Sequence, residues 1–103
     1  MGQPEGLIVV EVDETPSALV ARVSGEIDLA SAPELEEHLS HTDGKPILVD
    51  MSRVTFMNSS GLSALLRLRA GANSLRVINP SEAVAQLLRL VDLYDHFCGS
   101  PDK

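Results

Sequence analysis

Residues 50–62 read Asp-Met-Ser-Arg-Val-Thr-Phe-Met-Asn-Ser-Ser-Gly-Leu. They join a continuous apolar run at 46–51 to a leucine-rich run further on. The Asn and Ser side chains at 58–60 carry oxygens that accept hydrogen bonds from the free N–H groups of a first helical turn. The stretch therefore predicts a strand, a short linker over 52–57, and a helix that begins where the polar residues end.

The two serines in this stretch have two compatible interpretations. Ser59 and Ser60 can simply cap the helix. A serine hydroxyl here also lies at the positive end of a helix dipole, where the same N–H groups would stabilise a phosphate. Such a phosphate would add about two negative charges to the surface. The residues thus indicate a scaffold that can also act as a switch.

The rest of the chain predicts alternating strands and helices. Strands are expected at 7–12 and 18–24, separated by a turn at 13–17, with Gly25 ending the second strand. A helix is expected at 31–40, because Ser31 and Glu34 have capping-box spacing. Further on, the pattern predicts a helix over about 60–70 ended by Gly71, a strand at 75–78, a helix at 81–92 and a short edge strand at 94–97.

These elements favour an α/β fold in one domain. The domain would span residues 1–103 with a core at about 7–98, built as a mixed sheet of four to five strands with helices packed against it. The apolar run at 46–51, which only Asp50 interrupts, predicts a central strand covered on both faces, with Leu48 and Val49 in the core. Leu7 is expected to lie near an edge and to matter less.

Composition restricts the possible partners. The net charge of −7 argues against direct binding of nucleic acid and of anionic membrane surfaces, which both need clustered Lys and Arg. No long apolar span or signal-peptide pattern occurs, so membrane insertion is not expected. The single Cys98 cannot form an internal disulfide, which fits a cytoplasmic location.

Catalytic and cofactor sites are weakly supported. Asp28 and Asp50 have no compelling acid–base partner. The four possible metal ligands have poor spacing for zinc; they are His38, His41, His96 and Cys98. Neither a Gly-x-Ser-x-Gly nor a phosphate-cradling Gly-x-x-x-x-Gly-Lys sequence is present. The chain is therefore expected to act without catalysis and without a cofactor.

Three motifs stand out along the chain. They are Gly25-Glu-Ile-Asp-Leu29 with Ala32 and Leu35; Asp50-Met-Ser52 with Val54, Phe56 and Met57-Asn-Ser-Ser-Gly-Leu62; and Leu75-Arg-Val-Ile-Asn-Pro-Ser81 with Val84 and Leu87-Leu88. These motifs resemble those of STAS domains, the family of bacterial anti-sigma factor antagonists. They follow in family order and cover about Ile8 to Phe97. The middle motif is the most specific, and the two flanking motifs support it.

The resemblance implies a partner-switching cycle. The unphosphorylated chain would bind an anti-sigma factor that is also a serine kinase, and a sigma factor would be freed. The kinase would phosphorylate Ser59, binding would be lost, and a metal-dependent serine phosphatase would restore the hydroxyl. The implied partner-binding residues are Asp28, Asn58, Ser59, Ser60, Gly61 and Leu62.

Two of these residues leave alternatives open. Asn58 stands where the commonest family pattern has Asp; it keeps a capping oxygen but lacks the charge. If that carboxylate serves the kinase, phosphorylation here would be slow or absent; if it only caps, little changes. Asp28 is expected either beside the Ser59 loop or as a capping carboxylate for the first helix.

Two other functional classes are kept as alternatives. One is a STAS accessory subunit of a membrane-lipid ABC transporter or of a signalling complex, an alternative favoured by Asn58. The other is a nucleotide-binding protein, which the missing phosphate loop disfavours. Co-purified partners would distinguish the first alternative, and a nucleotide-binding assay the second.

Overall fold

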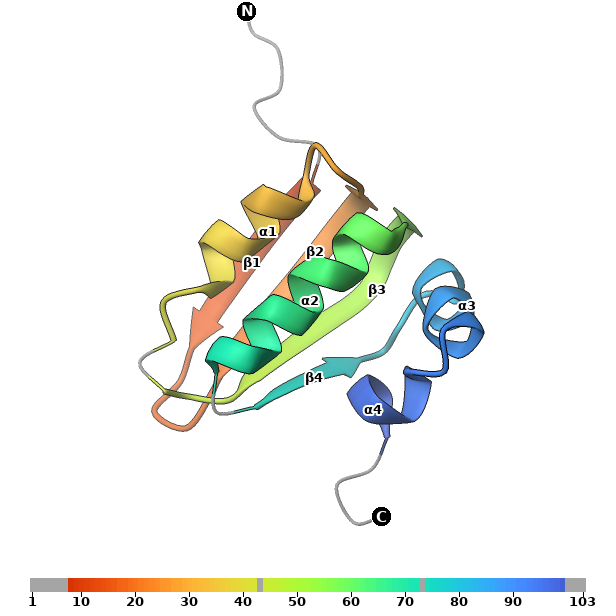
Figure 1. Ribbon diagram of the computed structural model, residues 1–103. Helices are drawn as coiled ribbons and strands as arrows, with labels where there is room; N and C mark the ends of the chain where they lie inside the picture. Colours follow the sequence, from red (N-terminus) through yellow and green to blue (C-terminus); the bar gives the residue numbers. More distant parts are fainter. Residues whose placement is uncertain (1–7, 43, 73, 100–103) are drawn as a thin grey trace, which may run out of the picture.

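The computed structural model describes residues 8–42, 44–72 and 74–99. Four strands, β1 (Ile8–Glu14), β2 (Leu19–Ile27), β3 (Ile47–Met57) and β4 (Leu75–Ile78), form one sheet in the order β1-β2-β3-β4 (Figure 1). β1 pairs antiparallel with β2, whereas β2, β3 and β4 are parallel. The helices are α1 (Ala32–Leu39), α2 (Ser59–Gly71), α3 (Glu82–Leu90) and α4 (Tyr94–Cys98). The expected single α/β domain with a mixed sheet is confirmed in its fold class.

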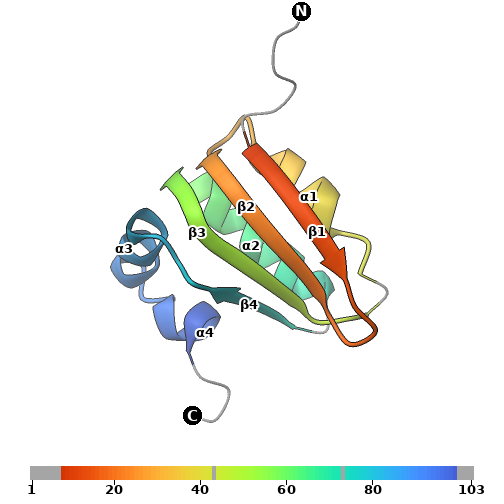
Figure 2. The ribbon, with the colours of Figure 1, turned by 180° about the vertical axis from the view of Figure 1, so that it is seen from behind.

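The hydrophobic core lies between the sheet and two helices. α1 and α2 run side by side across one face of the sheet (Figure 1). Leu35 and Leu39 of α1 and Leu65 of α2 are fully buried there. They meet the inward side chains of the strands, among them Val49 and Met51, which are also fully buried. The helices thus cover one face, and Figure 2 shows that, within residues 8–42, 44–72 and 74–99, no helix crosses β1, β2 and β3 on the other face.

The last two helices, α3 and α4, lie at the β4 edge of the sheet. β4 pairs only with residues 47–50 of β3, and α3 contacts β3 through Val84 and Leu88, both fully buried. α4 packs on β4, with Phe97 as its buried side chain. The guanidinium carbon of Arg69 lies 5.8 Å from the centre of the Phe97 ring, which ties α4 to the end of α2.

Two strands are longer than the sequence pattern predicts. The expected linker at 52–57 is wrong, because β3 continues to Met57 and buries Val54 and Met57. The expected end of the second strand at Gly25 is also wrong. Gly25 has φ +109° and adjoins a shift in register between β2 and β3, so it marks a β-bulge, after which β2 continues to Ile27.

The central strand is covered on one face only, contrary to expectation. Val49 is fully buried beneath the helices, as predicted. Leu48 points to the opposite face and is half-buried. Leu48 lies beside its strand neighbours Val20 and Arg76 on this face rather than beneath a second layer. Leu7 lies outside the described residues.

Two local expectations also fail. Ser31 is the N-cap of α1 by position, but its side chain makes no capping bond; its hydroxyl donates to the carbonyl of Glu26 at 2.7 Å. The expected edge strand at 94–97 is instead helix α4. Phe97 is the buried residue of that helix, and a four-residue segment with one inward side chain does not distinguish the two structures by periodicity.

Candidate functional site

The site predicted from sequence lies where β2 and β3 end together. Ile27 and Met57 are the last paired residues of the two parallel strands. The N–H of Asn58 donates to the carbonyl of Ile27 at 3.2 Å. Asp28 and Asn58 therefore leave the sheet side by side, so Asp28 adjoins the loop that leads to Ser59.

Asn58 fixes the start of α2. Its backbone is extended, and its Oδ1 accepts a 3.0 Å hydrogen bond from the N–H of Ser60. Its carbonyl accepts the N–H of Leu62 at 3.1 Å. The helix start predicted at this stretch is confirmed, with Asn58 rather than either serine as the capping side chain.

Ser59 is the first residue of α2 and is exposed. Within the described part of the chain, its hydroxyl makes no hydrogen bond, so it is free to meet a partner. Ser60 is half-buried, and its N–H is the group that Asn58 satisfies. The structure thus separates the two serines: Ser59 points to solvent, and Ser60 belongs to the cap.

Gly61 allows α2 to begin close to the sheet. A Cβ at this position would lie 2.6 Å from Cγ of Met57 and 2.7 Å from Cγ2 of Ile27. Leu62, one residue further, is half-buried and packs on the edge of the core. Gly61 therefore holds the first turn of α2 against the strand ends, while Leu62 is only partly available at the surface.

Asp28 shapes the turn before α1. Its Oδ1 accepts hydrogen bonds from the N–H groups of Ala30 and Ser31, at 3.0 and 3.2 Å. Its carbonyl accepts the N–H of Ala32 at 2.8 Å. The bonded N–H groups precede α1, which has no side-chain capping bond, so this carboxylate orders the turn before the helix rather than capping it. By backbone position Asp28 adjoins Asn58, and its role in partner binding stays a prediction.

Exposed apolar side chains lie at this end of the sheet, and they were not among the residues predicted from sequence. Leu29 is 78 % exposed, Phe56 45 % and Leu90 82 %. A surface cavity of about 260 Å³ lies between the end of β3 and α3; it is lined by Phe56, Met57, Ala83, Gln86, Leu87 and Leu90. One signal was available: Leu90 lies off the apolar stripe formed by Val84, Leu87, Leu88 and Val91.

Asp50 lies elsewhere on β3 and is held by hydrogen bonds. Burial by itself would raise the pKa of this carboxyl, but the N–H and hydroxyl of Ser52, the amide of Asn79 and the nearby charge of Arg22 outweigh it and lower the pKa. An ionised carboxylate with its lone pairs engaged is poorly suited to accept a proton from a substrate. Its position therefore points to a structural role.

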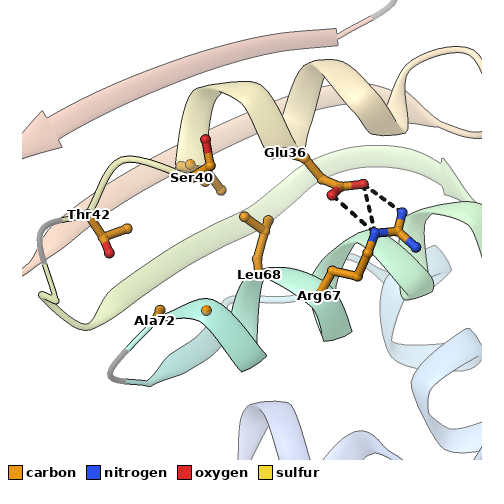
Figure 3. A pocket seen from close by; sticks show the side chains of 8 residues that line it. Glu36, Ser40, Thr42, Arg67, Leu68 and Ala72 are labelled. Atoms are coloured by element: carbon orange, nitrogen blue, oxygen red, sulfur yellow. Dashed lines mark hydrogen bonds and ion pairs between the residues drawn. The ribbon is translucent and has the colours of Figure 1, made fainter.

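A separate cavity lies at the far end of α2. It measures about 130 Å³ and opens between α1 and α2 beside Leu39, Leu68 and Ala72 (Figure 3). Glu36 and Arg67 form a bidentate ion pair at its mouth, and the hydrogen bond from Arg67 lowers the pKa of Glu36. This pair joins the two helices.

Among the described residues, no group of three or more His, Cys, Asp or Glu side chains is placed to hold a metal ion.

Comparison with known proteins places this arrangement in a family. A family model described as "STAS domain" matches residues 9–102, so the chain belongs to the STAS domain family. The anti-sigma-B factor antagonist of Staphylococcus aureus (strain NCTC 8325 / PS 47) is 32 % identical over 81 residues, which are 72 % of this chain and 75 % of that protein. The Bacillus subtilis (strain 168) anti-sigma-B factor antagonist is 29 % identical over 94 residues, covering 85 % and 86 %.

Solved structures show the same fold. A crystal structure of an anti-sigma factor antagonist from Mycobacterium paratuberculosis superposes with a TM-score of 0.77 at 26 % identity, covering 99 % of this chain and 93 % of that one. The anti-sigma factor antagonist SpoIIAA in its unphosphorylated form shares the fold with a TM-score of 0.65 at 24 % identity, covering 82 % of each chain. No helix in the described part of the chain is both long and apolar enough to cross a membrane.

Proposed function

We propose that this chain is a cytoplasmic anti-sigma factor antagonist that acts by binding and has no catalytic activity of its own. Its partner is an anti-sigma factor with serine-kinase activity, and binding of the unphosphorylated chain frees a sigma factor. The observation that carries the proposal is Ser59: an exposed hydroxyl at the first position of α2, beside Asp28 and Asn58, at the end of the sheet that carries the STAS-like sequence motif.

The surroundings of Ser59 supply what such a binding surface needs. Leu29, Phe56 and Leu90 offer exposed apolar area, and apolar area removed from water contributes about 25 cal/mol per Å². Asp28, Asn58, Ser60, Gly61 and Leu62 form the polar and structural frame next to them. The partner would place its own apolar side chains over this end of the sheet and exclude water from Ser59.

Phosphorylation of Ser59 would then reverse binding. The modification adds about two negative charges at the centre of a surface from which water is excluded. A hundredfold loss of affinity corresponds to only about 2.7 kcal/mol. Burial of an unpaired phosphate readily exceeds that value. A metal-dependent serine phosphatase would restore the hydroxyl and complete the cycle.

Intact-mass measurement tests the proposal. The purified chain is incubated with ATP and each candidate anti-sigma factor from the same genome. A gain of one phosphate that disappears in Ser59→Ala and persists in Ser60→Ala supports it. Capture by an ABC-transporter ATPase without phosphorylation would instead favour a transporter subunit, the alternative to which Asn58 points.

A further inference from the structure

The uncovered face of the sheet, called the rear face here, carries an ordered arrangement of charge. None of the helices in the described part of the chain crosses this face of β1, β2 and β3 (Figure 2). Paired residues of neighbouring strands point to the same face of a sheet, so the register defines rows of side chains across it. Two rows cross all four strands on the rear face. Leu48, half-buried at the centre of the first row, was expected to lie beneath a second layer.

The first row is acidic at one end and basic at the other. The register places Asp13 next to Val20, Val20 next to Leu48, and Leu48 next to Arg76. Three strand spacings of about 4.8 Å separate the terminal residues by about 14 Å, which exceeds the screening length of about 8 Å at physiological salt. Neither Asp13 nor Arg76 belongs to an ion pair among the described residues. The opposite charges therefore do not satisfy one another within one chain.

The second row places opposite charges on the two central strands. Glu11 pairs with Arg22, Arg22 with Asp50, and Asp50 with Ile78. Arg22 on β2 and Asp50 on β3 occupy the middle of the row. The two rows together give an apolar centre, Val20 and Leu48, with charged residues around it, which is the usual arrangement of a protein interface.

Twofold symmetry turns this arrangement into a self-complementary one. Two sheets can stack face to face about an axis across the strands or about an axis along them. An axis across the strands would set β1 over β1, so that the acidic residues Glu11 and Asp13 of the two copies face one another, which is repulsive. An axis along the strands sets β1 over β4 and β2 over β3 instead. Each row then meets its own copy in reverse order.

We propose that a second copy of this chain binds the rear face, forming a twofold dimer whose axis runs along the strands. Asp13 then faces Arg76 of the second copy, Val20 faces Leu48, and Arg22 faces Asp50. Glu11 lies at the rim, over Ile78 of the second copy, with access to solvent. Because the axis runs along the strands, both Ser59 sites lie at the same end of the dimer and remain uncovered.

Charge exchange tests this dimer in sedimentation equilibrium. Wild type is expected to be dimeric at a concentration of about 1 mM. Asp13→Arg and Arg76→Glu should each raise the dimer dissociation constant by about tenfold or more, since each sets like charges face to face. The double variant should restore the dissociation constant to within about threefold of wild type. Opposite charges then meet again at positions 13 and 76, with their signs exchanged. Glu37→Arg, an exposed charge change on α1, is the matched control and should leave it unchanged.

Three results would overturn the proposal. One is a wild-type chain that stays monomeric at that concentration, as it would if the rear face bound a different protein. The second is a dimer that neither single variant weakens, which would place the interface elsewhere. The third is a double variant whose dimer dissociation constant is as high as those of the single variants, which would mean that these two residues do not meet across the interface. The recovery of the double variant also shows that loss in the singles is not loss of folding.

Discussion

Asn58 Oδ1 accepts a 3.0 Å hydrogen bond from the N–H of Ser60, across the exposed Ser59 that lies between them. One side chain thus orders the backbone on both sides of the proposed phosphorylation site without engaging its hydroxyl. The cap and the switch are consequently different residues, so each can be altered separately.

Substitutions of Asn58 distinguish the cap from a role in phosphorylation. Asn58→Ala should cost about 1 kcal/mol through loss of the capping acceptor, or a fall of about 4–8 °C in melting temperature for a domain of this size. Asn58→Asp should keep the melting temperature, because both residues cap well, and should speed phosphorylation of Ser59. Thermal unfolding and a phosphorylation time course check the two parts. A clear destabilisation by Asp would contradict the capping role, and an unchanged rate would limit Asn58 to structure.

Gly61 and Gly71, both in α2, offer a matched comparison of Gly→Ala substitutions. Gly61→Ala should destabilise the fold by about 1–3 kcal/mol through overpacking, because the added Cβ would press on Met57 and Ile27 at the strand ends. Gly71→Ala meets no atom within 4 Å and should be neutral or stabilising by up to about 1 kcal/mol. Chemical denaturation measures both. Equal effects of the two substitutions would mean that the close approach at Gly61 is relieved at no cost.

Ile47 and Leu48 test which face of β3 is covered. The two side chains have equal numbers of carbons and occupy neighbouring positions, but Ile47 is fully buried and Leu48 is half-buried on the rear face. Ile47→Ala should cost about 2–5 kcal/mol. Leu48→Ala should cost about 1 kcal/mol, because less area is removed from water. Denaturation at a protein concentration far below that expected to favour the proposed dimer gives the comparison; a larger loss at Leu48 would contradict the one-sided core.

Asp50 makes stability depend on acid pH. Its folded-state pKa is lowered below the ordinary value of about 3.9. The ionised carboxylate therefore stabilises the fold above about pH 4, and this contribution is lost as the pH falls through the folded-state pKa. Asp50→Asn should lose less stability than wild type between about pH 5 and pH 2. Ser52→Ala, which removes one of the donors, should lie between them. Thermal unfolding across this pH range is the measurement, and the same dependence of stability on pH in all three chains would refute this role.

The sequence predicted the start of α2 better than it predicted the strand lengths. The helix start at 58–60 follows from local hydrogen bonding, and local chemistry is visible in a short stretch. The closeness of Asp28 to Asn58 follows from the rule that parallel strands end at one edge. The extent of β3 did not follow, because Ser52 and Arg53 face solvent from within a strand, and exposed strand residues have the composition of a linker.

Long-range relationships explain the remaining differences. Ser31 has the residue type and spacing of a capping box, but Glu26 supplies a carbonyl that its hydroxyl reaches first. Leu48 belongs to an apolar run typical of a strand buried on both faces. Whether helices cover one or both faces of the strand depends on other parts of the chain, so the strand sequence alone does not predict it. The exposure of Phe56 and Leu90 at the same end likewise depends on where α3 packs.

The affinity of the anti-sigma factor for three forms of the chain tests the proposed switch most directly. Isothermal titration calorimetry compares wild type, Ser59→Ala and Ser59→Asp. Ser59→Ala should bind like wild type, because the hydroxyl has no hydrogen-bond partner in the described part of the chain. Ser59→Asp should bind about tenfold or more weakly, since it places a charge within the contact surface. Equal affinities for Ser59→Ala and Ser59→Asp would contradict the role of Ser59 as the switch.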